Sequence, residues 1–187
     1  MLFRSSTFVE VEGLSDVLEG RCRPGHFRGV ATVVLKLLNI VQPDVAYFGR
    51  KDYQQQAMIR RMCRDLNLPT NIRTCATVRE LDGLALSSRN RYLSADERVA
   101  ALSLSKCLKL AKRRLSAGET DVEAVRREML ALLNEAEGVT VDYATIADPE
   151  SLADIASPQP EMIALVAAKV GPARLIDNLP IPLPLDL

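Results

Sequence analysis

The feature that most constrains the fold is an alternation of helical and extended patterns between residues 30 and 78. Apolar residues recur at helical spacing, give way to a short apolar run, and then repeat the same two patterns. The expected elements are a helix from Val30 that stops at Gln42-Pro43-Asp44, a strand at Val45–Phe48, a helix that stops before Pro69, and a strand at Asn71–Val78. This order predicts a parallel sheet with right-handed crossovers, in which ligand sites lie where strands end and helices begin.

The segments on either side follow other patterns. The further elements expected are a strand at Thr7–Val11, a helix from a capping box at Ser94–Glu97 to about Leu115, a helix from a second such signature at Thr120–Glu123 to near Gly138, and strands at Val139–Ile146, Met162–Val170 and Arg174–Asp177. A helical pair followed by strands predicts a small α+β domain with an antiparallel sheet. We therefore expect two domains, at residues 1–78 and 79–187.

Composition limits the classes of partner. Lys and Arg together number 24, as do Asp and Glu, so no net charge draws the chain towards nucleic acid or an anionic membrane. The longest apolar runs, such as Ile163–Ala168, fall far below the roughly 20 residues of a membrane span, and residues 1–6 lack a signal-peptide core. We expect a cytoplasmic protein that binds neither nucleic acid nor membranes.

Metal-binding residues are sparse in the sequence. Cys22, Cys63, Cys75 and Cys107 are widely spaced and form no C-x-x-C pair, and His26 is the only histidine. A zinc site would need ligands from four distant places in the chain. We therefore expect no protein-bound metal, and we interpret the cysteines as reduced, mostly buried thiols.

The first candidate site is the strand-to-helix junction Phe48-Gly49-Arg50-Lys51-Asp52. Gly49 permits a ligand to approach the backbone closely, the following helix offers N–H groups and the positive end of its dipole, and Lys51 adds a mobile positive charge. The junction therefore favours a phosphate. Asp52 is also interpretable as a helix-capping carboxylate, and Gln55, one turn later, as a solvated helix residue.

The second candidate site is the loop Asp82–Asn90, which follows a strand candidate on the expected ligand side of the sheet. The adjacent hydroxyls of Ser87 and Ser88 and the guanidinium of Arg89 can donate hydrogen bonds to phosphate oxygens from several directions. The loop is interpreted either as a mobile phosphate-binding segment or as a turn with helix-capping serines.

The third candidate site is the basic segment Arg21–Gly29, which opens the first helical pattern. Arg23, His26 and Arg28 can receive an anion. A solvated basic face and a structural histidine are the common alternatives.

In this order, the segments closely resemble the pantothenate synthetases, the ATP-dependent pantoate–β-alanine ligases of the nucleotidyltransferase superfamily. The matching segments are Leu18-Glu19-Gly20, Arg23–Val30, Gln42-Pro43-Asp44, Phe48-Gly49, Lys51–Gln55, Asp82–Ala85, Ser87–Leu93 and Ala173–Asn178. The resemblance implies an α/β fold with part of a Rossmann-like parallel sheet, followed by a small α+β C-terminal domain. It also implies ATP with Mg²⁺, pantoate and β-alanine as ligands, and a homodimer.

The resemblance further implies roles for individual residues. The family joins pantoate to ATP and releases pyrophosphate, after which the amine of β-alanine attacks the pantoyl adenylate and AMP leaves. By this resemblance Lys51 contacts the phosphates, Asp52 the ribose, Gln55 pantoate and Val78 the adenine. The implied ATP-binding residues are Phe48, Gly49, Arg50, Lys51, Asp52, Val78, Leu86, Ser87, Ser88 and Arg89, and the catalytic candidates among them are Lys51, Ser87, Ser88 and Arg89.

The chain departs from the family pattern in two places. Arg50 stands where the family usually has Glu, and it either tightens nucleotide binding or points to solvent. The family's first strand leads into a His-x-Gly-His motif, whereas the only histidine here, His26, belongs to the basic segment.

We therefore expect the C-terminal portion of such an enzyme, which is a poor catalyst alone and associates with itself or with an N-terminal fragment. The alternative is a non-catalytic nucleotide-binding or dimerisation module.

Overall fold

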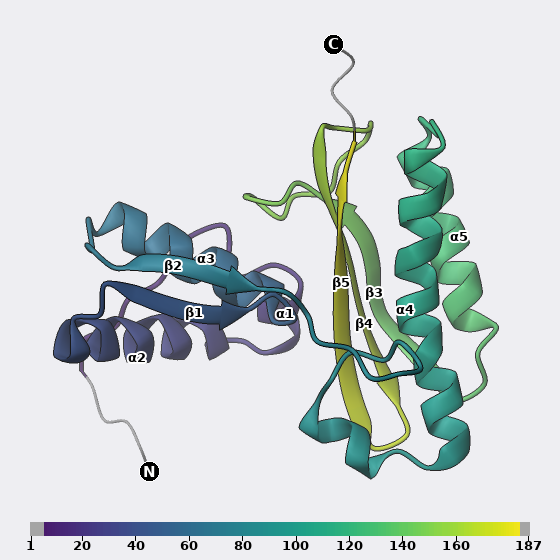
Figure 1. Ribbon diagram of the computed structural model, residues 1–187, viewed down its shortest axis with the longest axis horizontal. Helices are drawn as coiled ribbons and strands as arrows, with labels where there is room; N and C mark the ends of the chain where they lie inside the picture. The colour runs from purple at the N-terminus through teal and green to yellow at the C-terminus, as the bar shows by residue number, and fades with distance from the viewer. Residues whose placement is uncertain (1–5, 184–187) are drawn as a thin grey trace. The chain divides into compact units, whose positions relative to one another are not determined.

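The computed structural model describes residues 6–183, which form two compact units (Figure 1). Within these residues the first unit consists of 6–76 with 150–152, and the second of 77–149 with 153–183. Residues 1–5, which belong to the segment expected to lack a signal-peptide core, lie outside the described part of the chain. None of the helices between residues 6 and 183 combines the length and the apolar character needed to cross a membrane.

The first unit is built around a two-stranded parallel sheet. Its elements are α1 (Glu19–Cys22), α2 (His26–Val41), β1 (Val45–Gly49), α3 (Tyr53–Asp65) and β2 (Asn71–Cys75). β1 pairs with β2 in parallel, from Val45 opposite Asn71 to Gly49 opposite Cys75. The predicted alternation of helices and parallel strands is therefore confirmed. α3 contacts both strands and α2, and its side chains Met58, Ile59 and Met62 are fully buried.

One face of this small sheet is exposed. Half-buried and exposed residues alternate along β2, and the same alternation runs along β1 from Ala46, as expected when a sheet packs on one face. Tyr47 is 71% exposed, and Leu37, Ile40 and Val41 near the end of α2 are exposed as well. Because parallel sheets are normally covered on both faces, the first unit presents an apolar surface that a further polypeptide segment could cover.

The second unit combines two long helices with a three-stranded antiparallel sheet. Its elements are the 3-10 helix η1 (Ser88–Tyr92), α4 (Ala95–Ser116), α5 (Val122–Asn134), β3 (Val139–Ala147), β4 (Glu161–Val170) and β5 (Ala173–Pro182). The strand order is β3-β4-β5, and α4 and α5 pack against the sheet (Figure 1). Apolar side chains of the central strand β4 join those of both helices in one core. This arrangement confirms the predicted α+β architecture with an antiparallel sheet.

Two predicted strands of the first unit differ from the structure. The strand expected at Thr7–Val11 is wrong, because these residues belong to no sheet and the Val9 N–H donates instead to the Thr32 hydroxyl in α2, at 3.0 Å. β2 ends at Cys75 rather than at Val78, since its pairing with β1 ends there.

The boundaries of other elements show which local signals were reliable. Ser94 and Glu97 form the predicted capping box. The second signature is wrong in detail, because the N-cap of α5 is Asp121, which accepts a hydrogen bond from the Ala124 N–H at 2.9 Å. β5 continues to Pro182 instead of ending at Asp177, since an edge strand tolerates prolines. The structure also begins α2 at His26, one turn before the predicted start.

The cysteines divide equally between the interior and the surface. Cys63 and Cys107 are buried, whereas Cys22 and Cys75 are exposed. The prediction of mostly buried thiols is therefore wrong for half of them. Burial raises the pKa of Cys107 to about 12, so its thiol stays protonated at neutral pH.

One buried amide attaches the N-terminal segment of the first unit to α3. The Gln54 side chain is 3% exposed. Its Nε2 donates to the carbonyl oxygens of Leu14, at 2.7 Å, and Val17, at 2.8 Å, and its Oε1 accepts from the Glu19 N–H at 3.0 Å. Since buried backbone groups need partners, this side chain fixes the loop that precedes α1.

We predict that Gln54→Ala lowers the free energy of unfolding of the first unit by about 2–4 kcal/mol, because three backbone groups lose their partner. Gln55→Ala is the matched control at the next, half-buried position, and we expect it to change this free energy by about 0.5 kcal/mol or less. Amide hydrogen exchange of α3 in increasing urea measures both. Equal effects of the two substitutions would contradict the anchoring role.

Candidate functional site

The predicted residues Phe48–Asp52 lie together at the junction of β1 and α3. β1 ends at Gly49, and the Arg50 N–H donates to the Cys75 carbonyl at 2.8 Å, so the turn is tied to the end of β2. Asp52 occupies the N-cap position of α3. The junction therefore lies where two parallel strands end and a helix begins, which is the edge at which such sheets bind ligands.

The surroundings of Gly49 and Asp52 show whether the backbone is open to a ligand and whether Asp52 caps α3. A Cβ placed on Gly49 would meet no atom of the described chain within 4 Å, and Gly49 does not have a positive φ. The space beside its backbone is therefore open. The capping interpretation of the Asp52 carboxylate is wrong, because this exposed side chain makes no capping hydrogen bond to α3. The positive end of the α3 dipole thus faces a turn that carries both Lys51 and a carboxylate that does not cap the helix.

Tertiary structure brings part of the basic segment to this junction. His26 is the first residue of α2. Burial and the charge of Arg23 lower the pKa of His26 from its usual 6.5, whereas the charges of Glu19 and Asp52 act to raise it. His26 therefore lies within electrostatic reach of Asp52, a proximity that the sequence did not indicate. Arg28 is engaged elsewhere, since its guanidinium carbon lies 4.1 Å from the centre of the Phe8 ring.

The glutamines at the start of α3 have different environments. Gln55, the predicted pantoate contact, is half-buried in the first turn. Its neighbours are structural: Gln54 anchors the preceding loop as described above, and Gln56 is 1% exposed and accepts a hydrogen bond from the Thr74 hydroxyl at 3.0 Å. Sequence reasoning missed these two roles, because a run of three glutamines carries no signal of which one faces the interior.

The remaining predicted residues belong to the second unit. Val78 and Leu86 are exposed and are joined by a hydrogen bond from the Leu86 N–H to the Val78 carbonyl at 2.9 Å. Ser87 caps η1, since its hydroxyl oxygen accepts from the Arg89 N–H at 3.2 Å. The side chains of Ser88 and Arg89 are exposed. The capping interpretation is thus correct for Ser87, but its hydroxyl proton stays available for donation.

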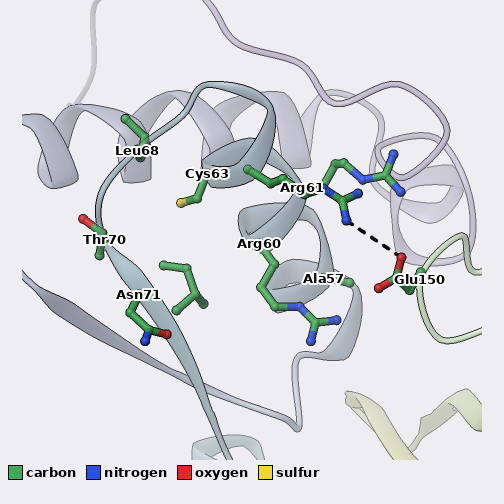
Figure 2. A pocket seen from close by; sticks show the side chains of 10 residues that line it. Ala57, Arg60, Arg61, Cys63, Leu68, Thr70, Asn71 and Glu150 are labelled. Carbon is green, nitrogen blue, oxygen red and sulfur yellow. Dashed lines mark ion pairs between the residues drawn. The ribbon is translucent and has the colours of Figure 1, made fainter.

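A basic pocket lies at the other end of α3 (Figure 2). It has a volume of about 380 Å³ and is lined by Arg60, Arg61 and Arg64, together with Thr70, Asn71 and Glu150 among others. None of the predicted site residues lines it. Arg64 approaches the Glu150 carboxylate at 4.0 Å, so the pocket carries its own countercharge. The sequence did not mark this pocket as a site.

The described residues offer no ready-made metal centre. Between residues 6 and 183, no group of three or more His, Cys, Asp or Glu side chains is arranged to hold a metal ion.

Comparison with known proteins adds a family match. Residues 1–180 match the family model described as pantoate-beta-alanine ligase. The chain is 51% identical over 175 residues to a pantothenate synthetase of Herpetosiphon aurantiacus, covering 93% of this chain and 63% of the relative. It is 51% identical over 174 residues to one of Moorella thermoacetica, covering 93% and 62%. The chain therefore spans slightly less than two thirds of the length of these relatives.

Solved structures show the same likeness. The structure of pantothenate synthetase from Thermus thermophilus superposes with a TM-score of 0.90 at 43% identity, covering 96% of this chain and 64% of that one. A pantoate-beta-alanine ligase from Francisella tularensis, complexed with beta-gamma ATP and beta-alanine, superposes with a TM-score of 0.66 at 31% identity, covering 92% and 57%. The fold of both units therefore matches solved members of one family.

We predict that the single histidine reports on the charge of the junction. Asp52→Asn should lower the pKa of His26 further, because it removes a charge that raises this pKa, and Arg23→Gln should raise it. An NMR titration of the imidazole in the untagged chain measures both shifts. Asp65→Asn, at the far end of α3, is the control and should leave the pKa of His26 unchanged. No response to Asp52→Asn would show that the two side chains do not face each other.

Proposed function

This chain belongs to the pantoate–β-alanine ligase family, and from that premise we propose that its residues take part in the ATP-dependent joining of pantoate to β-alanine. The observation that carries the proposal is the junction at Gly49–Asp52. There an open backbone position, a lysine and a helix N-terminus without a side-chain cap lie at the ends of two parallel strands. These are the features that favour a phosphate group.

In the proposed reaction a pantoate carboxylate oxygen attacks the α-phosphorus of ATP, and pyrophosphate leaves. The β-alanine amine then attacks the acyl carbon of the pantoyl adenylate and loses a proton. The bond from the acyl carbon to the bridging oxygen breaks, and AMP leaves with that oxygen, which came from the pantoate carboxylate. Negative charge grows on the α-phosphate and on pyrophosphate during the first step, so fixed positive groups lower the barrier. Mg²⁺ bound to the phosphates would neutralise part of the same charge.

Residues of the first unit are proposed to bind the nucleotide and the acid. Lys51 contacts the phosphates, Asp52 the ribose hydroxyls and Gln55 pantoate. The exposed Asp52 carboxylate supports its role, since it makes no capping bond and remains able to accept from a hydroxyl. Phe48, Gly49 and Arg50 complete the nucleotide contact, with Gly49 admitting the ligand to the backbone.

Residues of the second unit are proposed to bind the rest of the ATP. Ser87, Ser88 and Arg89 donate hydrogen bonds to the phosphates, and Val78 and Leu86 contact the nucleotide. The exposure of Ser88 and Arg89, and the unused hydroxyl proton of the Ser87 cap, support this role.

A second polypeptide segment is proposed to complete the site. The sequence has a single histidine and therefore no His-x-Gly-His motif. The exposed apolar side chains Tyr47, Leu37, Ile40 and Val41 support association of the first unit with such a segment or with another copy of the chain.

We predict that Lys51→Ala reduces pyrophosphate release at least about 100-fold, because it removes a charge that stabilises the transition state. The assay uses ATP, Mg²⁺ and pantoate, and the chain mixed with the part of the Herpetosiphon aurantiacus relative that this chain does not match. Arg60→Ala removes one positive charge from the same helix and is the matched control, with an expected change of about twofold or less.

Three outcomes of this assay bear on the proposal. A greater loss of pyrophosphate release with Arg60→Ala than with Lys51→Ala would indicate that the nucleotide binds in the basic pocket. It would contradict the proposal that the nucleotide binds at the junction. Binding of Mg²⁺-ATP without pyrophosphate release, even with the added segment, would favour the non-catalytic nucleotide-binding module. Full activity of this chain alone would contradict the need for a second segment.

A further inference from the structure

The loop that carries Leu86–Arg89 is a compact unit of two parts. Residues 78–86 form a small hairpin, in which the Glu80 N–H donates to the Leu84 carbonyl at 2.8 Å and Arg79 pairs with Ala85 as an antiparallel bridge. Residues 88–92 form η1. Leu86–Arg89 therefore lies where the hairpin passes into the 3-10 helix, and both parts must stay in register for these side chains to point together.

The Asn90 side chain links the two parts. It is 7% exposed, and its Nδ2 donates to the Glu80 carboxylate at 2.6 Å and to the Ala85 carbonyl at 3.0 Å. One amide group thus spans from η1 to both strands of the hairpin. Its Oδ1 is buried and has no hydrogen-bond partner among the described residues. A buried amide oxygen without a partner is unfavourable. The two hydrogen bonds that the nitrogen makes must therefore offset this cost and hold the side chain in place.

Glu80 connects Asn90 to α4. One of its carboxylate oxygens accepts from Asn90 and the other from the Arg98 guanidinium at 2.6 Å. Arg98 also donates to Asp82 in the hairpin turn, at 2.6 and 2.9 Å. The hydrogen bonds from Asn90 and Arg98 lower the pKa of Glu80, so the carboxylate is ionised at neutral pH and both bonds are charge-assisted.

A further ion pair attaches the hairpin to the sheet. The Arg79 guanidinium donates to both carboxylate oxygens of Asp177 in β5, at 2.6 and 3.0 Å, and to the Gly83 carbonyl at 3.1 Å. Asp177 is 4% exposed. The hairpin is thereby fixed to α4 on one side and to β5 on the other, and Asn90 alone among these side chains extends the attachment to η1.

We propose that Asn90 and Glu80 are positioning residues that hold Leu86–Arg89 in the conformation that binds phosphate, an inference that rests on the proposed function. Neither side chain touches the ligand. They act by ordering the backbone of Ser87, Ser88 and Arg89 before ATP arrives, so that binding does not have to offset the loss of conformational entropy of the loop. The sequence pattern Ser-Ser-Arg-Asn thus joins three binding residues to the residue that orients them.

The test compares three variants of the full chain. Asn90→Asp removes the donor and places a carboxylate against that of Glu80. Arg91→Gln is the matched control, because it changes the net charge by the same amount in the next residue of η1 while leaving the network intact. The double variant Asn90→Asp/Glu80→Gln exchanges donor and acceptor: the new amide nitrogen can donate to residue 90, and its oxygen can accept from Arg98.

Two measurements are made on each variant. Amide hydrogen exchange reads the order of the loop at the bonded N–H groups of Leu86, Arg89 and Asn90, with β4 amides as the measure of an intact fold. Calorimetric titration with Mg²⁺-ATP gives the dissociation constant.

For Asn90→Asp we expect about tenfold faster exchange at the loop amides and about tenfold weaker ATP binding, with β4 unchanged. Arg91→Gln should change either quantity by about twofold or less. The double variant should regain part of both losses, because it restores the bond between residues 80 and 90 but not the bond to the Ala85 carbonyl. This partial recovery also shows that residue 90 acts through Glu80 if the single variant folds poorly.

The outcomes separate the two proposals. If the unaltered chain binds no Mg²⁺-ATP, the proposed function fails, while loop exchange still decides whether Asn90 orders the loop. If the unaltered chain binds ATP and Asn90→Asp binds it equally well, the positioning role is overturned and the function stands. Unchanged exchange at the loop amides, or equal effects of Asn90→Asp and Arg91→Gln, also overturns the positioning role.

Discussion

The parallel pairing of β1 with β2 is the constraint on which the candidate site of the first unit depends. Parallel strands bring their carboxyl ends to the same edge, and here the Arg50 N–H closes that edge by bonding to the Cys75 carbonyl. The turn between β1 and α3 is therefore attached to the sheet through its backbone. Lys51 and Asp52 belong to this turn, so the pairing of the strands positions their backbone. A site that stabilises developing charge requires groups that are positioned in advance.

Burial of polar groups organises the surroundings of that turn. Gln54 satisfies three backbone groups of the preceding segment from inside the protein, and that segment leads directly into α1 and the start of α2. His26 is thereby brought near Asp52, where the balance of burial and opposite charges sets its pKa. A buried side chain thus helps to decide which charged groups lie beside the junction.

In the second unit, hydrogen bonds and ion pairs between side chains attach the loop of residues 78–92 to its surroundings. The loop has a hairpin and a 3-10 helix too short to be stable alone, and side chains of η1, α4 and β5 supply the missing bonds. The Arg79–Asp177 pair is bidentate, and Asp177 is almost fully buried, a geometry in which removing either partner leaves a costly unpaired charge. The exposed Ser88 and Arg89 therefore lie on a loop that side-chain bonds attach to α4 and β5.

The sequence by itself determined the order of most helices and strands, the parallel and antiparallel character of the two sheets, the capping box at Ser94 and the position of the junction after β1. These features rest on periodicity and on residues close in the chain, where local backbone preferences act. Only the tertiary structure decided that residues 7–11 form no strand, that Asp52 does not cap α3, and that Asn90 joins Glu80. The first and the last depend on hydrogen bonds between groups whose distance in space the sequence does not encode: Val9 bonds to Thr32 across 23 residues, and Asn90 bonds to Glu80 across 10. The second depends on the orientation of the Asp52 side chain, which the residue type at an N-cap position does not settle.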